Sequence, residues 1–255
     1  MRNFLLSVLL ASAALPCFAA DSPWNGTWKL NRDQSQMTGT ILTFTQTGNM
    51  YTIDTGGYKY SFACDGKVYP ALADRTMTCI QNGNVYTTTH MVKGKTTATV
   101  THTLSGDGNT VSDVTSGTRP DGTSYTETST SQRVGEGKGL VGTWKETEVK
   151  SAAPESIVLT VTGDTLRWED PGYKETSETR LDGTPGPISG PEIPSGMMVS
   201  TLAQGSNKVV STLTLNGKDF AKDEMTLSDD GATITDVEWT PGKESEKRTY
   251  VYDKQ

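Results

Sequence analysis

The chain carries the same sequence pattern twice, and this duplication limits the fold more than any other feature. Gly26-Thr27-Trp28-Lys29 returns as Gly142-Thr143-Trp144-Lys145, and the segment from Leu104 to Val111 returns as Leu227 to Ile234. The offset between the copies changes only from 116 residues (26 to 142) to 123 residues (104 to 227). A repeat of this length is a complete folding unit, so the sequence predicts two tandem domains of one kind.

The ends of the two repeats can be placed from local composition. Residues 1–20 have a basic start, an apolar stretch and small residues before a cut near Ala19 or Ala20, which predicts a secretory signal peptide. We expect the first repeat over residues 21–134 and the second over 140–255. The glycine-rich residues 135–139 between them are typical of a flexible linker. The mature protein is therefore expected in the periplasm or outside the cell.

Short alternating segments predict an all-β fold. In Lys95 to Leu104, threonines occupy one face while Ala98, Val100, His102 and Leu104 occupy the other, as the period of a half-buried strand requires. Tyr58, Tyr60, Phe62 and Cys64 form a second stripe of this kind. Short hairpin turn signals such as Asn82-Gly83-Asn84 favour a meander. We expect each repeat to close into an up-and-down barrel of eight or nine strands, with a β-sandwich as the alternative.

Several of these segments resemble bacterial secreted lipocalin-like domains, which are mostly of unknown function. The resemblance is carried by the segment Gly26 to Asn31, by Asp65 to Pro70 and by Ser105 to Val111, and it spans nearly all of the first repeat. It implies a calyx in which Gly26 and Trp28, and likewise Gly142 and Trp144, plug the closed end. It also implies a basic residue on the last strand that stacks on the tryptophan. Arg133 is the candidate in the first repeat, whereas the second repeat has Asp253 near the matching position and Arg248 elsewhere on the strand.

Cysteine spacing predicts one disulfide. Only Cys64 and Cys79 remain after the signal peptide is removed. If residues 70–73 form a four-residue hairpin loop, Tyr69 pairs with Asp74 and the two cysteines lie directly opposite one another, within disulfide reach. The second repeat has Leu181 in place of Cys64, so the bridge is not a requirement of the fold.

Charge and residue content argue against several functions. The chain has 23 Lys and Arg against 30 Asp and Glu, with a net charge of −7, which argues against nucleic acids and anionic membranes as partners. The two histidines, His90 and His102, flank a turn near Gly94. Simple strand registers place them either on opposite faces or about 13 Å apart, so we expect no metal site. No catalytic motif is present, and we expect no cofactor and no catalytic residue.

Three classes of function stay open. The first is a non-catalytic binding protein that holds a small amphiphilic or aromatic ligand, since a small barrel can enclose one such molecule. The second is an envelope protein whose barrels are filled by their own side chains and whose surface contacts a partner. The third, an enzyme built on a lipocalin-like domain, is the least supported. The volume of any interior cavity separates the first two classes.

Overall fold

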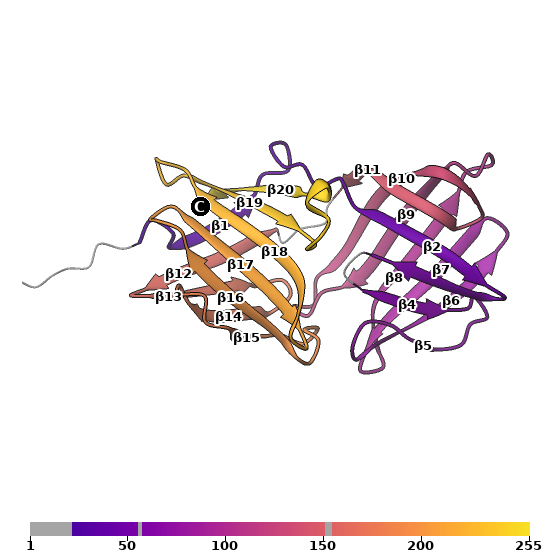
Figure 1. Cartoon of the computed structure of the whole chain (residues 1–255), viewed down its shortest axis with the longest axis horizontal. Helices are drawn as coiled ribbons and strands as arrows, with labels where there is room; N and C mark the ends of the chain where they lie inside the picture. Colours follow the sequence, from indigo (N-terminus) through magenta and orange to yellow (C-terminus); the bar gives the residue numbers. More distant parts are fainter. Residues whose placement is uncertain (1–21, 56–57, 151–154) are drawn as a thin grey trace, which may run out of the picture.

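The computed structural model describes residues 22–55, 58–150 and 155–255, and it is built from two antiparallel β-barrels (Figure 1). This confirms the predicted fold class. The predicted signal peptide lies outside the described residues. One short 3₁₀ helix, Glu244–Glu246, is the only helical element in the described part of the chain.

In the part of the chain that the structure describes, each repeat has ten strands rather than the expected eight or nine, and the strands of the second repeat follow those of the first in the same order. The first repeat has β1 (Gly26–Leu30), β2 (Ile41–Thr47), β3 (Met50–Asp54), β4 (Lys59–Phe62), β5 (Tyr69–Pro70), β6 (Arg75–Asn82), β7 (Val85–Val92), β8 (Lys95–Leu104), β9 (Thr110–Thr118) and β10 (Ser124–Lys138). The second repeat has β11 (Val141–Lys150), β12 (Ser156–Thr162), β13 (Thr165–Asp170), β14 (Glu175–Arg180), β15 (Gly186–Ser189), β16 (Met197–Ala203), β17 (Lys208–Leu215), β18 (Lys218–Leu227), β19 (Thr233–Trp239) and β20 (Arg248–Lys254).

The first strand of each repeat is built into the barrel of the other repeat. β1 pairs with β12 and β20, and thereby closes a barrel with β12–β20. β11 pairs with β10 and β2 in a ten-stranded sheet with β2–β10. Figure 1 shows the indigo β1 among the orange and yellow strands of the second repeat. We call β1 with β12–β20 the C-terminal barrel, and β2–β11 the N-terminal barrel.

This exchange differs from the expected division into domains 21–134 and 140–255. The predicted linker, residues 135–139, is the end of β10 and part of the tight turn into β11, where Lys138 pairs with Val141. Backbone hydrogen bonds of the β10–β11 hairpin therefore hold a segment whose glycines suggested flexibility. The chain instead passes between the barrels after β1 and after β11.

The segment that follows β1 is anchored on the C-terminal barrel. Asn31 donates a side-chain hydrogen bond of 2.8 Å to Asp253, and Gln36 forms an isolated bridge with Thr249. Met37 is buried in the core of the same barrel. These contacts hold β1 in the barrel of the second repeat before the chain reaches β2.

An engineered cross-link tests the exchange. Lys29 lies directly opposite Ser156, so Lys29→Cys with Ser156→Cys should form a disulfide in high yield under mild oxidation. If β1 stayed in its own repeat, residue 29 would occupy the place of Lys145, which lies opposite Ile41. The control pair Lys29→Cys with Ile41→Cys should therefore stay unlinked. Mass spectrometry of peptides under non-reducing conditions reads both, and a linked control pair would refute the exchange.

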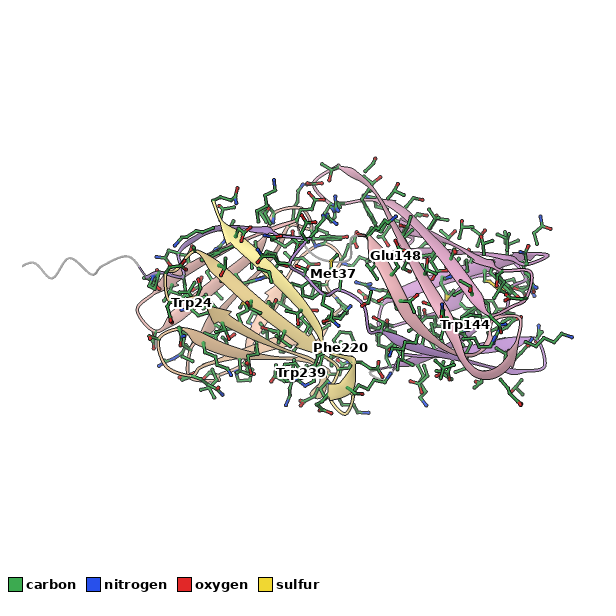
Figure 2. The ribbon with its side chains drawn as sticks, turned by 90° about the horizontal axis from the view of Figure 1, so that it is seen from above. Trp24, Met37, Trp144, Glu148, Phe220 and Trp239 are labelled. Atoms are coloured by element: carbon green, nitrogen blue, oxygen red, sulfur yellow. A yellow bond between two sulfur atoms is a disulfide. The ribbon has the colours of Figure 1, made fainter. Side chains whose placement is uncertain are left out.

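Each Gly-x-Trp motif sits in the core of the barrel that its strand joins. Trp28 and Trp144 are almost fully buried, and their indole N–H groups donate to the carbonyls of Trp24 and Leu140 at 3.0 and 2.8 Å. Figure 2 shows Trp24 in one barrel and Trp144 in the other, with Phe220 between them where the barrels meet. Phe220 stacks on Tyr58 there, so this end of each barrel faces the other barrel.

A basic side chain from the last strand covers each tryptophan. The Arg133 guanidinium lies 4.1 Å from the ring centroid of Trp144, and the Lys254 ammonium lies 5.0 Å from that of Trp28. Arg133 therefore stacks on the tryptophan of the other repeat, and Lys254, rather than Asp253 or Arg248, has this role in the C-terminal barrel. The motif needs glycine because the φ angles of Gly26 and Gly142 are +146° and +134°, which side chains rarely allow, and a Cβ at Gly142 would also lie 2.5 Å from Arg133 Nη1.

The predicted disulfide between Cys64 and Cys79 is present, with a Cα–Cα distance of 4.2 Å. The register around it differs from the expected one, because Tyr69 lies opposite Met77 rather than Asp74. The disulfide joins the segment after β4 to β6. It lies beside a seam of the N-terminal barrel, where β4 and β5, the two edge strands of the ten-stranded sheet, do not pair with each other.

Aromatic side chains stack on one another along the inside of the N-terminal barrel. Phe62 stacks on Tyr51 with ring centroids 5.9 Å apart, and Tyr60 lies 6.2 Å from Phe62 and 5.9 Å from Tyr58. Tyr58 in turn stacks on Phe220 of the C-terminal barrel at 5.8 Å. The stripe predicted from alternation therefore forms the core of one barrel and continues into contact with the other.

Candidate functional site

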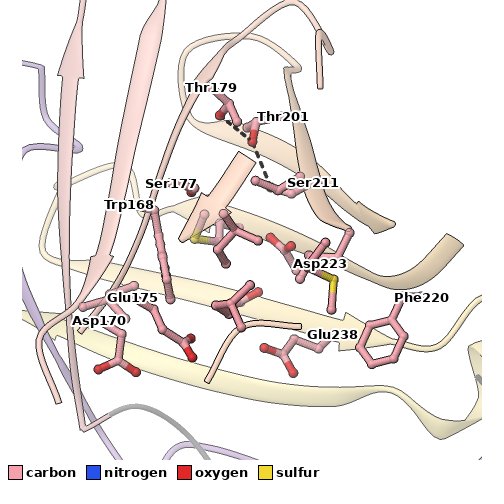
Figure 3. Close-up of a pocket in the computed structure, with 18 of the residues that line it drawn as sticks. Trp168, Asp170, Glu175, Ser177, Thr179, Thr201, Ser211, Phe220, Asp223 and Glu238 are labelled. Atoms are coloured by element: carbon pink, nitrogen blue, oxygen red, sulfur yellow. Dashed lines mark hydrogen bonds between the residues drawn. The ribbon is translucent and has the colours of Figure 1, made fainter. Parts of the chain in front are cut away.

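The C-terminal barrel encloses a cavity of about 430 Å³. It is lined by residues from β12–β20 of its own barrel, and Tyr58, Leu72 and Arg75 of the N-terminal barrel lie at its open end. Figure 3 shows Trp168 and Phe220 along its sides, with carboxyl groups from several strands around the same space. Because the barrels meet at their open ends, the N-terminal barrel forms part of the cavity wall.

The cavity exists because the second repeat has lost the aromatic stripe of the first. Leu181 takes the place of Cys64 in the alignment of the repeats. Thr179 and Ser177, two and four residues before Leu181, therefore correspond to Phe62 and Tyr60 of the first repeat. The register agrees, since Thr179 pairs with Leu166 as Phe62 pairs with Tyr51. Small hydroxyl side chains thus replace two large rings, and the space the rings would fill is left open.

The hydroxyl groups of this wall bond to one another. Thr179 donates to Thr201 at 3.0 Å, and Thr201 lies 3.4 Å from the hydroxyl of Ser211 (Figure 3). All three side chains are buried. Thr201 has the register position that Cys79 has in the first repeat. The second repeat thus has a hydrogen-bonding hydroxyl where the first repeat has a disulfide-bonded cysteine.

Three carboxyl groups gather on β18 and β19, next to Ser211, which lies directly opposite Asp223 on β17. Asp223 lies directly opposite Glu238, and Asp236 lies one step deeper toward Trp28, opposite Met225 on β18 and Tyr250 on β20. Like charges opposite one another on neighbouring strands repel, so this arrangement is unfavourable unless a cation or a proton compensates it. Arg248 compensates Glu238 with a hydrogen bond of 3.2 Å.

The environment of these carboxyls favours their neutral forms. Burial raises the pKa of Asp223 to about 7, the Glu238 carboxylate adds to the rise, and a hydrogen bond from Ser211 opposes it. Burial, followed by the charges of Asp223 and Glu238, also raises the pKa of Asp236 well above its usual value. The pKa of Glu238 is raised by burial and lowered by Arg248.

A second pair of carboxyls lies on the other side of the cavity. Burial raises the pKa of Glu175 to about 7, the charges of Asp170 and Glu192 add to the rise, and Arg75 opposes it. Burial also raises the pKa of Asp170, although its Oδ1 accepts backbone N–H bonds from Gly172 and Tyr173 at 2.9 and 3.1 Å. These two side chains and Arg75 also line a neighbouring hollow of about 380 Å³ between the barrels.

The two histidines of the first repeat converge inside the N-terminal barrel. A bulge between His90 and Met91 puts His90 and His102 on the same face, and the Thr88 hydroxyl lies 3.3 Å from one Nε2 and 3.4 Å from the other. The pairing of His90 with Ala98 gives the expected register in which the histidines share a face four residues apart, but their ring nitrogens come together because both side chains lean toward Thr88. Burial, with His102 and Arg75, lowers the pKa of His90 to about 4.

The described residues offer no metal centre. His102 Nδ1 lies 2.7 Å from the carboxylate of Asp113, which orients the ring but completes only part of a ligand set. No group of three or more His, Cys, Asp or Glu side chains among residues 22–55, 58–150 and 155–255 is arranged to hold a metal ion.

The acidic residues that line the cavity were not predicted from the sequence. Asp236 and Glu238 follow Ile234 at every second position of β19, so their spacing alone puts two acids on the same face as a buried residue. That pattern could have been recognised. The partner strand and its Asp223 could not, because only the register between β18 and β19 brings them together.

No family model matches this chain, and none of the curated proteins is significantly similar to it. Among the described residues, no helix is both long and apolar enough to cross a membrane. Function therefore has to be inferred from the barrels and the cavity themselves.

Proposed function

We propose that this protein is a secreted or periplasmic, non-catalytic, lipocalin-like binding protein that holds one small amphiphilic or aromatic ligand in its C-terminal barrel. The observation that carries the proposal is the interior cavity. Its volume of about 430 Å³ lies within the range of ~300–1,000 Å³ that is usual for small-molecule sites. Aromatic and aliphatic side chains line part of it and polar groups line the rest, which suits an amphiphilic molecule.

Two observations support the location and the division of roles. Disulfides such as Cys64–Cys79 persist mainly outside the cytoplasm, in line with the predicted signal peptide. The aromatic stack of the N-terminal barrel occupies the space that is open in the C-terminal barrel. It therefore favours the alternative role for the N-terminal barrel alone, as a structural unit that covers the open end of its neighbour.

Binding of the neutral fluorescent probe N-phenyl-1-naphthylamine tests the proposal. The probe should bind the wild-type protein at one site, with enhanced fluorescence. Ser177→Tyr with Thr179→Phe restores the bulk of the first repeat and should abolish this binding. The single variant Ser177→Tyr is milder and should weaken probe binding. It serves as the test if the double variant folds poorly, and thermal unfolding checks the fold of each.

Glu178→Tyr is the matched control, since Glu178 lies on the same strand but is exposed on the outside of the barrel. It should leave probe binding unchanged. A probe that fails to bind the wild-type protein, or binds equally well after the cavity is filled, would contradict the proposed function.

A further inference from the structure

We infer that the ligand is an organic cation, an amine whose ammonium group lies among Asp223, Asp236 and Glu238 and whose apolar body lies against Trp168 and Phe220. This inference rests on the proposed function of the cavity and specifies the chemistry of its ligand. It is carried by three features of the site: an orphaned carboxylate, an excess of acids and a substitution between the repeats.

Asp236 has a buried carboxyl oxygen without a hydrogen-bond partner. The residue is only 8% exposed, and its Oδ1 is one of two unpartnered buried side-chain atoms in the described structure. Burying a polar group without a partner is unfavourable, so such groups are rare and mark places where something else binds. Because Asp236 lines the cavity, its missing partner has to enter from the cavity.

The charges around the cavity favour a positive partner. Its lining holds the carboxyl groups of Asp170, Glu175, Asp223, Asp236 and Glu238, but only one basic side chain, Arg75. Arg248 is already bonded to Glu238. Arg75 donates from Nη2 to the backbone carbonyl of Glu192 at 2.8 Å, and its Nε is the second unpartnered atom, so this one cation leaves four of the five carboxyls without a basic partner in the cavity lining. An ammonium group carries three N–H donors and would meet both the orphaned oxygen and the excess charge.

Comparison of the repeats shows that Asp236 has lost an internal partner. When the repeats are aligned on the duplicated segments that start at Leu104 and Leu227, Asp236 corresponds to Asp113 and Met225 corresponds to His102. The registers agree, because His102 lies opposite Asp113 and Met225 lies opposite Asp236. In the N-terminal barrel, His102 Nδ1 lies 2.7 Å from the carboxylate of Asp113. In the barrel with the cavity, a methionine leaves the same carboxyl free for a ligand.

The apolar walls suit the rest of such a molecule. Trp168 and Phe220 flank the cavity, and Tyr58 stacks on Phe220 at its open end (Figure 3). Aromatic faces attract cations as well as apolar groups, so they do not oppose the entry of an amine. A ligand with one ammonium group and one aromatic or aliphatic body therefore satisfies both halves of the site.

A matched series of ligands tests the inference: 4-phenylbutylamine, 4-phenylbutan-1-ol and 4-phenylbutanoate, which share one skeleton. Titration calorimetry at pH 8 on the full-length mature protein should show the amine binding at least about tenfold more tightly than the alcohol, with the carboxylate weakest. Asp236→Asn and Met225→His should each reduce amine binding to about the level of the alcohol. Binding of the alcohol should change less than about twofold. Asp229→Asn, in an exposed turn, should change nothing.

The pH dependence should follow the carboxyls. The groups that face Asp236 are Asp223 and Glu238 beside it, Arg248, Tyr250 and Tyr252 on β20, and Asp170 and Glu175 across the cavity. Burial raises the pKa of Asp223 and of Glu175 to about 7, so these groups take up protons as the pH falls from 8 to 5.5. Amine affinity should therefore fall at least about fivefold over this range, while alcohol affinity stays constant.

The outcomes separate the two proposals. If the alcohol or the carboxylate binds as tightly as the amine, or if the fluorescent probe binds and none of the three does, the cation inference is overturned while the binding function stands. If neither the probe nor any of the three binds, both fall. Retention of the full preference for amine in both Asp236→Asn and Met225→His would also overturn the proposed position of the ammonium group.

Discussion

Replacing Trp28 by alanine should lower the free energy of unfolding by about 3–5 kcal/mol, the usual effect of removing a fully buried large aromatic side chain. Trp28 has no exposed surface and packs in the core with Ile157, Leu159 and Ile234 of the second repeat. The change also removes the indole hydrogen bond to the carbonyl of Trp24 and the contact with Lys254. Urea unfolding of the wild type and the variant measures the loss.

The position of the damage is as informative as its size. Because β1 belongs to the C-terminal barrel, Trp28→Ala should speed hydrogen exchange in β12 and β20 and spare β7–β9. Lys29→Ala, an exposed change on the same strand, should alter stability by less than about 0.5 kcal/mol. Faster hydrogen exchange confined to β2–β10 would contradict the placement of β1 in the C-terminal barrel.

Removing the disulfide should produce the second large loss of stability. The bond closes a sequence separation of 15 residues, so Cys64→Ala with Cys79→Ala should lower the free energy of unfolding by about 3 kcal/mol in the chain-entropy model. The bond also lies beside the seam between β4 and β5, where the N-terminal barrel has no strand pairing. The C-terminal barrel closes the equivalent seam by pairing Thr176 with Ser189.

Urea unfolding with and without a reductant gives the measurement and its control together. A reductant should destabilise the wild type by a similar amount and leave the double alanine variant unchanged. Hydrogen exchange should rise around β4–β6 and stay constant in β14–β16. A variant as stable as the wild type would show that the seam is held by packing of the aromatic stack alone.

Much of the architecture could be predicted from local patterns. Alternating side chains predict strands whatever their partners, and repetition of Gly-Thr-Trp-Lys predicts two equivalent barrels. The Cys64–Cys79 bond was also predictable, because only two cysteines remain after the predicted signal peptide. The register used to argue it was nevertheless different, since Tyr69 pairs with Met77. The cysteine count allowed only one disulfide, whereas it did not determine the length of the loop after Tyr69 or the register of the strands on either side of it.

The site depended on relations that local patterns do not contain. His90 and His102 both contact Thr88 because of a single bulge between His90 and Met91. The sequence of β7 and β8 does not predict this bulge. The cavity depends on which side chains replace Tyr60 and Phe62 in the second repeat and on the neighbouring strands that do not refill the space. Asp236 is unusual only because Met225, rather than a basic residue, lies across from it.

By itself the sequence determined the two repeats of strands and the one disulfide, because these follow from periodicity and residue type, whereas the inward position of each Gly-x-Trp tryptophan was only implied by the resemblance to lipocalin-like domains. Only the tertiary structure decided which copy of the first strand closes which barrel. The two copies, Gly26 to Lys29 and Gly142 to Lys145, have the same sequence, and strand pairing uses backbone hydrogen bonds that are the same for either copy. The contacts of Gln36 and Met37 with the second repeat distinguish them, and these form only when the whole chain is folded.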